Sequence, residues 1–269
     1  MRQVVATVIS NEKLWGEFSF HGRRKHLSTW LMWLSCARVA SEAKPGQFVM
    51  VNCGEECLLP RPFSIHQVND DSIALFYAVL VEGKGTRWLS QRRADDKISL
   101  LGPLGNGFIK SPTSHNLLLV AGGNGIAPLY FLAQEALKRK YSVTLLYGTV
   151  DKERYPISPQ IKLVSATEDG TIGHSGKVTD LLTEFVGRAD QIFACGPMAM
   201  YLDMVLKKQE LKLTGKSIQI SLEIRMGCGR GVCYGCTIKT KNGLKQVCQD
   251  GPVFDLDDIL WDELDLAPK

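Results

Sequence analysis

Four cysteines near the C-terminus constrain the fold of this chain more than any other feature. They are separated by four, two and eleven intervening residues: Cys228, Cys233, Cys236 and Cys248. The first two gaps have the plant-type spacing of [2Fe–2S] ligands. Three glycines among the first three cysteines let the backbone curl round a cluster and direct N–H groups at its sulfides. A structural zinc site is the alternative, but such sites usually carry two complete Cys-x2–4-Cys pairs, so the spacing favours the cluster.

Composition indicates the cellular compartment of the chain and excludes some classes of partner. The other four cysteines are scattered, and no secretory signal opens the chain, so the bunched set indicates metal ligation in a reducing cytoplasm. The net charge of +4 comes without a dense basic run, which argues against a nucleic-acid partner. The most apolar stretches, 30–37 and 116–121, are far shorter than the roughly 20 residues that span a bilayer, so we expect no membrane contact.

Two patterns of predicted secondary structure divide the rest of the chain. From Val4 to Leu101, short strands with turn signals and one brief helix near 85–91 predict an antiparallel barrel. From Leu117, apolar strands alternate with helices, which is typical of a parallel, Rossmann-like sheet. We therefore predict a β-barrel domain over 1–111, an α/β nucleotide domain over 112–216 and a small cluster module over 217–269.

Two motifs of the predicted parallel sheet are candidates for nucleotide binding. The glycine-rich turn 122–128 follows the strand 117–121 and opens a helix, an arrangement that brings a helix N-terminus against a pyrophosphate. A bare strand-to-helix turn is the alternative for this motif. Cys195 ends an apolar strand at the carboxyl edge where ligands bind, with a buried structural thiol as the alternative. The candidate residues are Gly122, Gly123, Gly125, Pro128, Cys195, Gly196 and Pro197.

Two further motifs lie in the predicted barrel. The guanidinium of Arg61 suits a diphosphate because of its bidentate fork, and the Ser64 hydroxyl can hydrogen-bond the edge of a flavin. Gly85 and Thr86, at a predicted helix start, offer N–H groups to a phosphate. Each motif alone is compatible with a surface ion pair or a turn, but together they favour a flavin site. The full first motif is Arg61, Pro62, Phe63 and Ser64.

In their order along the chain, 61–64, 83–86, 122–128 and 195–197, the four motifs resemble those of the ferredoxin–NADP reductase superfamily. The tail from Ser221 to Cys236 and from Cys248 to Phe254 is similar to that of the electron-transfer subunits of class 1B dihydroorotate dehydrogenases. The resemblance implies that residues 61–64 and 85–86 contact FAD, and that the four bunched cysteines hold a [2Fe–2S] cluster. It also implies FAD contacts through the backbone of three small or aliphatic residues, Ala78, Val79 and Leu80.

The resemblance further implies a function and a partner. The chain would be an oxidoreductase subunit passing electrons between NAD(H), FAD and the cluster, to or from an FMN-containing catalytic subunit that oxidises dihydroorotate in pyrimidine biosynthesis. A heterotetramer with two chains of each kind is expected. Nicotinamides exchange two electrons and a cluster exchanges one, so the flavin must lie between them. No catalytic acid or base is expected in this subunit.

Two other functions share parts of this layout. One is a subunit of an NADH-dependent ferredoxin reductase or sulfide dehydrogenase complex, and the four cysteines favour the orotate pathway over it. The other is a redox sensor without turnover, against which the intact FAD and nicotinamide motifs argue.

Three features remain outside these motifs. Asp151, shortly after the strand that ends at Tyr147, is a candidate to accept bonds from a ribose and thus favours NAD over NADP, although Lys152 and Arg154 weaken that preference. Glu223 is expected to be a plain strand-surface charge, with an approach to the flavin as the alternative. Residues 11–41 match no motif, and we expect them to form a solvent loop, with a surface for a partner as the alternative.

Overall fold

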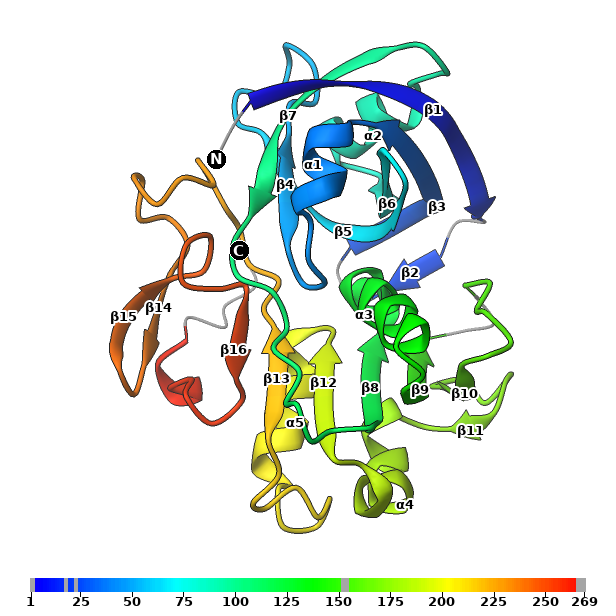
Figure 1. Cartoon of the computed structure of the whole chain (residues 1–269), viewed down its shortest axis with the longest axis vertical. Coiled ribbons are helices and arrows are strands. Elements are labelled where there is room, and N and C mark those ends of the chain that lie inside the picture. Colours follow the sequence, from blue (N-terminus) through cyan, green and yellow to red (C-terminus); the bar gives the residue numbers. More distant parts are fainter. Residues whose placement is uncertain (1–2, 17–18, 22–23, 151–154, 265–269) are drawn as a thin grey trace.

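The computed structural model describes residues 3–16, 19–21, 24–150 and 155–264. A β-barrel lies above a twisted sheet flanked by helices, and the C-terminal segment packs beside both (Figure 1). The predicted fold class is confirmed. Within the described residues, no helix has both the length and the apolar character needed to cross a membrane.

The barrel is antiparallel and closed. Its strands pair in the order β1-β7-β4-β5-β6-β3, and pairing of β1 with β3 closes the ring, while β2 extends β3 outside it. The strands are β1 (Gln3–Trp15), β2 (Ser19–His21), β3 (Arg24–Ser35), β4 (Phe48–Val51), β5 (Arg61–Asn69), β6 (Ser72–Leu80) and β7 (Lys97–Leu104). Two short helices, α1 (Ala37–Glu42) and α2 (Lys84–Ser90), accompany them, and α2 confirms the predicted brief helix.

The expectation of a solvent loop over 11–41 is wrong. The described part of this segment forms the end of β1, the strands β2 and β3, and α1. Lys13 pairs with Trp30, and Met32 and Leu34 are fully buried in the barrel core. Alternation of inward and outward side chains along β3 explains this placement, because a strand with one apolar face must cover a core.

Strand β6 joins the barrel to the rest of the molecule because both of its faces are buried. Leu75 and Tyr77 point into the barrel core, whereas Phe76 packs into the core that surrounds α3. The barrel and the nucleotide domain therefore share a continuous apolar contact at this strand.

The second half of the chain is built on a sheet with the strand order β11-β10-β9-β8-β12-β13-β16. All neighbours pair in parallel except β16, which is antiparallel to β13. The strands are β8 (Asn116–Gly122), β9 (Ser142–Thr149), β10 (Lys162–Thr167), β11 (His174–Ser175), β12 (Gln191–Cys195), β13 (Ile218–Ser221) and β16 (Val253–Asp255). The helical elements are η1 (Gly123–Gly125), α3 (Ile126–Lys138), η2 (Val178–Leu181), α4 (Leu182–Phe185), η3 (Val186–Arg188) and α5 (Met198–Leu206).

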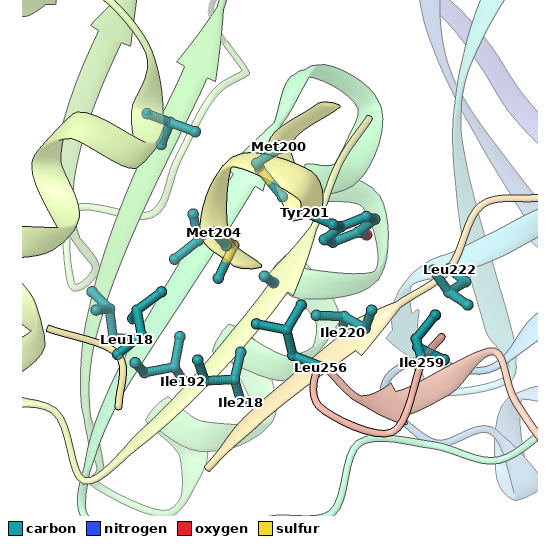
Figure 2. Close-up of a cluster of buried hydrophobic side chains, with 14 of the residues drawn as sticks. Leu118, Ile192, Met200, Tyr201, Met204, Ile218, Ile220, Leu222, Leu256 and Ile259 are labelled. Carbon is teal, nitrogen blue, oxygen red and sulfur yellow. The ribbon is translucent and has the colours of Figure 1, made fainter. Parts of the chain in front are cut away.

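The C-terminal segment shares its core with the nucleotide domain. It contains the hairpin β14 (Thr237–Thr240) and β15 (Gly243–Gln246), then β16 and the short η4 (Trp261–Glu263). Figure 2 shows Leu256 and Ile259 of this segment beside Ile220 and near Tyr201 of α5. Because β13 pairs with β12, and β16 pairs with β13 in the same sheet, the predicted boundary after residue 216 falls within one continuous sheet.

Candidate functional site

A cavity of ≈ 640 Å³ lies where the barrel, the nucleotide sheet and the C-terminal segment meet. Its barrel wall comes from β5 and β6, and its opposite wall from the carboxyl ends of β8, β9 and β12. The segment after β13 closes one end, up to Met226. In a parallel sheet this edge is where ligands usually bind.

The predicted flavin residues divide into two groups. Five line the cavity: Pro62, Phe63, Ser64, Ala78 and Leu80. The other four lie outside it, and of these Val79 points into the barrel core. The remaining three are Arg61, Gly85 and Thr86.

Arg61, Gly85 and Thr86 nevertheless lie together beside the cavity. A Cβ added at Gly85 would lie 3.2 Å from Cγ of Arg61, so the start of α2 packs directly on the arginine stem. The Thr86 hydroxyl accepts a bond from the Leu80 N–H at 3.4 Å and donates to the Gly83 carbonyl at 3.2 Å. The barrel thus brings all three predicted flavin stretches into one place.

The two predicted nucleotide motifs pack against each other. Strands β8 and β12 are neighbours, and Ala121 pairs with Cys195. A Cβ at Gly125 would overlap the carbonyl group of Cys195, and one at Gly122 would lie 2.7 Å from Cδ of Pro197. These glycines are therefore needed for close approach of the turn to the end of β12.

The residues of the two nucleotide motifs differ in their exposure to the cavity. Gly122, Gly123 and Pro197 line it, whereas Gly125, Pro128, Cys195 and Gly196 lie behind the wall. A pyrophosphate would meet the turn on the side that Gly122 and Gly123 form.

The Cys195 thiol sits in a buried polar network at the cavity wall. Its sulfur lies 3.5 Å from the Ser221 carbonyl oxygen and 3.7 Å from Oε1 of Glu223. Tyr201 donates to the same carbonyl at 2.7 Å and accepts from the Gly196 N–H at 3.0 Å. Burial, and then the Glu223 carboxylate, raise the pKa of Cys195 well above its usual range, so the thiol stays protonated. Glu223 itself lines the cavity, which favours the alternative of an approach to the flavin over a plain strand-surface charge.

Several lining residues belong to none of the predicted motifs. Trp15 and Thr29 come from the β1–β3 pair that was expected to be a loop. Glu168 and Lys177 line the far end of the cavity, beside the carboxyl end of β10. Ligands usually bind at the carboxyl ends of parallel strands, which would have pointed to Glu168. The strand before it, β10, was not among the predicted strands. Asp151, Lys152 and Arg154 lie outside the described residues.

Three of the four cysteines lie in the loop before β14, and Cys248 follows β15. They interact as two pairs, Cys228 with Cys233 and Cys236 with Cys248, and the two pairs are linked by a weaker interaction of Cys228 with Cys248. Sulfur atoms of both pairs accept backbone bonds, from Arg230 N to Cys228 Sγ at 3.2 Å and from Cys248 N to Cys236 Sγ at 3.5 Å. Among the described residues, no three potential ligands converge closely enough to hold a single metal ion.

The local electrostatics fit thiolate ligands. Burial opposes ionisation of Cys228, but N–H groups of the loop, including that of Arg230, lower its pKa to about 6. Burial and the neighbouring Cys236 raise the pKa of Cys248 to about 12, a repulsion that iron between the sulfurs would remove. Gly229 has φ +66° and packs its backbone on Met50, so the loop rests on the barrel. Donor type, pairing and backbone N–H groups all fit a two-iron cluster.

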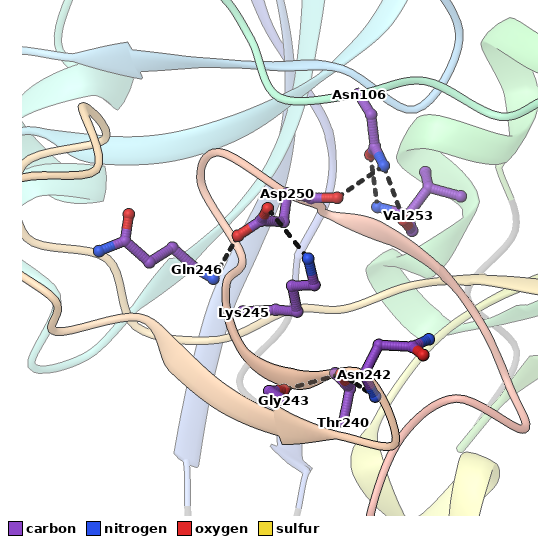
Figure 3. A network of polar contacts seen from close by, with 8 residues as sticks. All are labelled: Asn106, Thr240, Asn242, Gly243, Lys245, Gln246, Asp250 and Val253. Carbon is purple, nitrogen blue, oxygen red and sulfur yellow. Dashed lines mark hydrogen bonds and ion pairs between the residues drawn. The ribbon is translucent and has the colours of Figure 1, made fainter.

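Asn106 fixes the cysteine loop to the connection between the two domains. Its side-chain amide donates to the Asp250 carbonyl at 2.8 Å and the Val253 carbonyl at 2.9 Å, and its oxygen accepts from the Val253 N–H at 2.9 Å. Figure 3 shows this clamp beside the ion pair of Asp250 with Lys245. Asn106 belongs to none of the motifs recognised in the sequence.

Comparisons with known proteins agree with this geometry. The model of the iron–sulfur cluster binding domain of dihydroorotate dehydrogenase B matches residues 223–260. The electron transfer subunit of dihydroorotate dehydrogenase B (NAD(+)) from Desulforamulus reducens is 36% identical over 248 residues, covering 87% of this chain and 94% of the relative. That from Caldanaerobacter subterraneus is 33% identical, covering 95% and 98%.

Solved structures show the same fold. The NADH-dependent reduced ferredoxin–NADP oxidoreductase studied for flavin-based electron bifurcation aligns with TM-score 0.79 and 28% identity, over 97% of this chain and 91% of that one. A ferredoxin NADP+ reductase from Neisseria gonorrhoeae, with bound FAD and NADP, aligns with TM-score 0.58 and 15% identity, over 78% and 92%. The expected resemblance is confirmed: this chain belongs to the family of electron transfer subunits of dihydroorotate dehydrogenase B (NAD(+)).

Proposed function

We propose that this chain carries electrons between NAD(H) and the catalytic subunit of a dihydroorotate dehydrogenase, through FAD and a [2Fe–2S] cluster. The observation that carries the proposal is the single cavity in which the flavin motif, the nucleotide turn and the start of the cysteine loop meet. Family membership supports the same function.

The cavity supports a definite order of the groups. The flavin would lie against Pro62–Ser64 and Ala78–Leu80, with its diphosphate towards Arg61 and Gly85. The nicotinamide would enter at Pro197, between that wall and Glu223. The carboxyl ends of β12, β8, β9 and β10 form a row of neighbouring strands spaced by about 4.8 Å, along which the rest of the dinucleotide would extend.

Glu168 supports NAD rather than NADP as the nucleotide. It lies at the end of this row, in the segment that follows β10, and it has no ion pair with any residue that the structure describes. A carboxylate there would accept bonds from a ribose and repel a 2′-phosphate. Lys177 is close by, at 3.8 Å from the Asp203 carboxylate, which it shares with Lys207 at 3.2 Å.

The cysteine loop supplies the exit for electrons. Met226 lines the cavity and Cys228 follows two residues later, so the cluster would sit directly beyond the cavity wall. Cys233 is exposed, as are Val232 and Tyr234 next to it, which leaves this side open to a partner. The flavin supplies the conversion between two-electron and one-electron transfer, while the residues of this chain hold and orient the groups.

The partner is proposed to be an FMN-containing chain, in an assembly with two chains of each kind.

A cytoplasmic location is also proposed, since all eight cysteines are free thiols and four of them are proposed metal ligands.

Purification of the native chain with its bound partners tests the proposal. The expected result is a yellow-brown complex with an FMN-containing chain that reduces NAD⁺ when dihydroorotate is added. A partner that fails to oxidise dihydroorotate, or a colourless zinc protein, would contradict it.

A second candidate is a subunit of an NADH-dependent ferredoxin reductase complex. The TM-score of 0.79 with the electron-bifurcating oxidoreductase favours it as the runner-up. Reduction of ferredoxin by the purified complex, without dihydroorotate oxidation, would identify this candidate.

A further inference from the structure

A buried histidine lies at the junction of the barrel and the nucleotide domain. His66 belongs to β5 and its side chain is fully enclosed. Ile65 and Gln67 pair with Leu75 and Ala74, which are consecutive in β6, so His66 is the additional residue of a β-bulge. A bulge aims its side chain away from the regular alternation of the strand, and here the side chain meets α3.

The hydrogen bonds of the His66 ring cross from the barrel to the nucleotide domain. Its Nδ1 lies 2.9 Å from the carbonyl oxygen of Ala127 in the first turn of α3, and its Nε2 lies 2.5 Å from the Tyr155 hydroxyl. A carbonyl oxygen only accepts, so Nδ1 carries the proton and Nε2 accepts from Tyr155. Both nitrogens of the ring therefore have hydrogen-bond partners. The Gln67 amide donates to the Tyr155 hydroxyl at 3.0 Å, so this hydroxyl has both a donor and an acceptor.

Aromatic rings from three other segments enclose the imidazole. Tyr130 of α3 stacks on it at 5.1 Å and 18°, Phe76 of β6 lies at 5.3 Å, and Tyr155 meets it edge-on at 4.9 Å. Burial lowers the pKa of His66 to about 4, against the opposing effect of its bond to Ala127. The ring is therefore neutral near pH 7, and Nε2 remains an acceptor.

This network connects the two walls of the cavity. Ser64, two residues before His66, lines the flavin wall, whereas Ala127, in the first turn of α3, lines the opposite wall. His66 does not itself line the cavity. Hydride transfer requires reacting atoms about 3–3.5 Å apart, and a displacement of about 1 Å can cost roughly a hundredfold in rate.

We propose that His66 is a positioning residue for hydride transfer. By holding Ala127 and Tyr155 against β5, it fixes the distance between the nicotinamide and the flavin. The inference rests on the proposed function, because the reaction it serves is the exchange of hydride between NAD(H) and FAD.

Rapid mixing of NADH with the holoprotein tests this role in wild type and in the variants His66→Phe, His66→Asn and Tyr155→Phe. His66→Phe is expected to lower the limiting rate of flavin reduction by at least roughly tenfold, with less than about a threefold change in the NADH concentration at half-maximal rate. The long-wavelength charge-transfer absorbance of the nicotinamide–flavin complex should weaken in parallel. His66→Asn, whose amide can donate in place of Nδ1, should recover most of the rate, and Tyr155→Phe should fall between.

Gln191→Met is the matched control. Gln191 is also buried, donates to the Ile109 carbonyl at 2.9 Å and accepts from Ser111 N at 3.0 Å, but it lies at the opposite end of β12 from the cavity. This variant should lose thermal stability without a change in the limiting rate.

Three other results would overturn the inference. If His66→Phe retains FAD and reacts at the wild-type rate, the positioning role is wrong. If His66→Phe loses FAD, His66→Asn and Tyr155→Phe decide the question, and wild-type rates in both would contradict the role. Failure of NADH to reduce the wild-type flavin would instead refute the proposed function, and the positioning role with it.

Discussion

At the scale of single residues, His66 links protonation to stability. Its pKa is lowered by burial from 6.5 to about 4, so between these pH values the unfolded chain binds a proton that the folded chain does not. Stability contributed by the neutral ring is complete above about pH 6.5 and is lost as the pH falls towards 4, by roughly 3 kcal/mol in total.

Urea unfolding of wild type and His66→Phe at several pH values measures this linkage. The difference in free energy of unfolding between the two proteins should shrink by roughly 2 kcal/mol between pH 7 and pH 5, because only the wild type loses this contribution. A difference that stays constant over this range would show that His66 is not buried as a neutral ring.

A second residue-scale prediction concerns the choice of nucleotide. Glu168→Lys should raise the ratio of kcat/KM for NADPH to that for NADH by at least roughly tenfold, since it replaces repulsion of a 2′-phosphate by attraction. Glu184→Lys makes the same charge change on α4, outside the cavity wall, and should leave the ratio unaltered. Equal ratios in wild type and Glu168→Lys would place the ribose elsewhere.

At the scale of elements, the contact between the glycine turn and the end of β12 determines the nucleotide site. Gly125 has φ −59°, so alanine there adds no backbone strain, but its Cβ would overlap Cys195. Gly125→Ala should therefore weaken NADH binding at least roughly tenfold and leave the FAD content unchanged. Gly187→Ala, where the added Cβ meets no atom within 4 Å, is the control. Titration of flavin bleaching with NADH measures both, and equal affinities would contradict the tight packing.

The clamp at Asn106 gives a second prediction at this scale. Asn106→Ala removes three hydrogen bonds to the segment after Cys248, at a cost of about 1–3 kcal/mol. We expect faster loss of cluster absorbance under an iron chelator, with normal FAD content. Asn242→Ala should behave as wild type, because Asn242 is exposed and its bond to Thr240 uses its backbone N–H, which alanine retains. Equal rates of cluster loss in the two variants would show that the clamp is not needed.

At the scale of the whole molecule, electrons are proposed to pass from NAD(H) through FAD to the cluster. Loss of the cluster should therefore block transfer beyond the flavin without preventing reduction of the flavin by NADH. Cys248→Ser should abolish the cluster and reduce electron transfer from dihydroorotate to NAD⁺ in the complex by roughly a hundredfold or more, because the iron loses a thiolate ligand. NADH should still bleach the flavin in this variant. Cys57→Ser, outside the cysteine loop, is the control. Full complex activity without cluster absorbance would show that electrons bypass the loop.

The candidate site divides into residues that local patterns predict and residues that they do not. Spacing alone singled out Cys228 to Cys236, and the turn at Gly122 followed from an apolar strand running into glycines. Glu168 and His66 carry no such pattern. Each acquires its role only from residues far away in the chain, Thr149 next to Glu168 and Tyr155 next to His66.

The sequence by itself determined the two structural classes, the order of the motifs and the chemistry of the cysteine loop. These depend on periodicity, turn residues and donor type, which act over a few neighbouring residues. The tertiary structure alone decided that β1 closes the barrel on β3, that β16 joins the nucleotide sheet and that one cavity unites the motifs. Those outcomes depend on which distant apolar faces pack together, because such contacts join residues far apart in the chain and leave no local pattern.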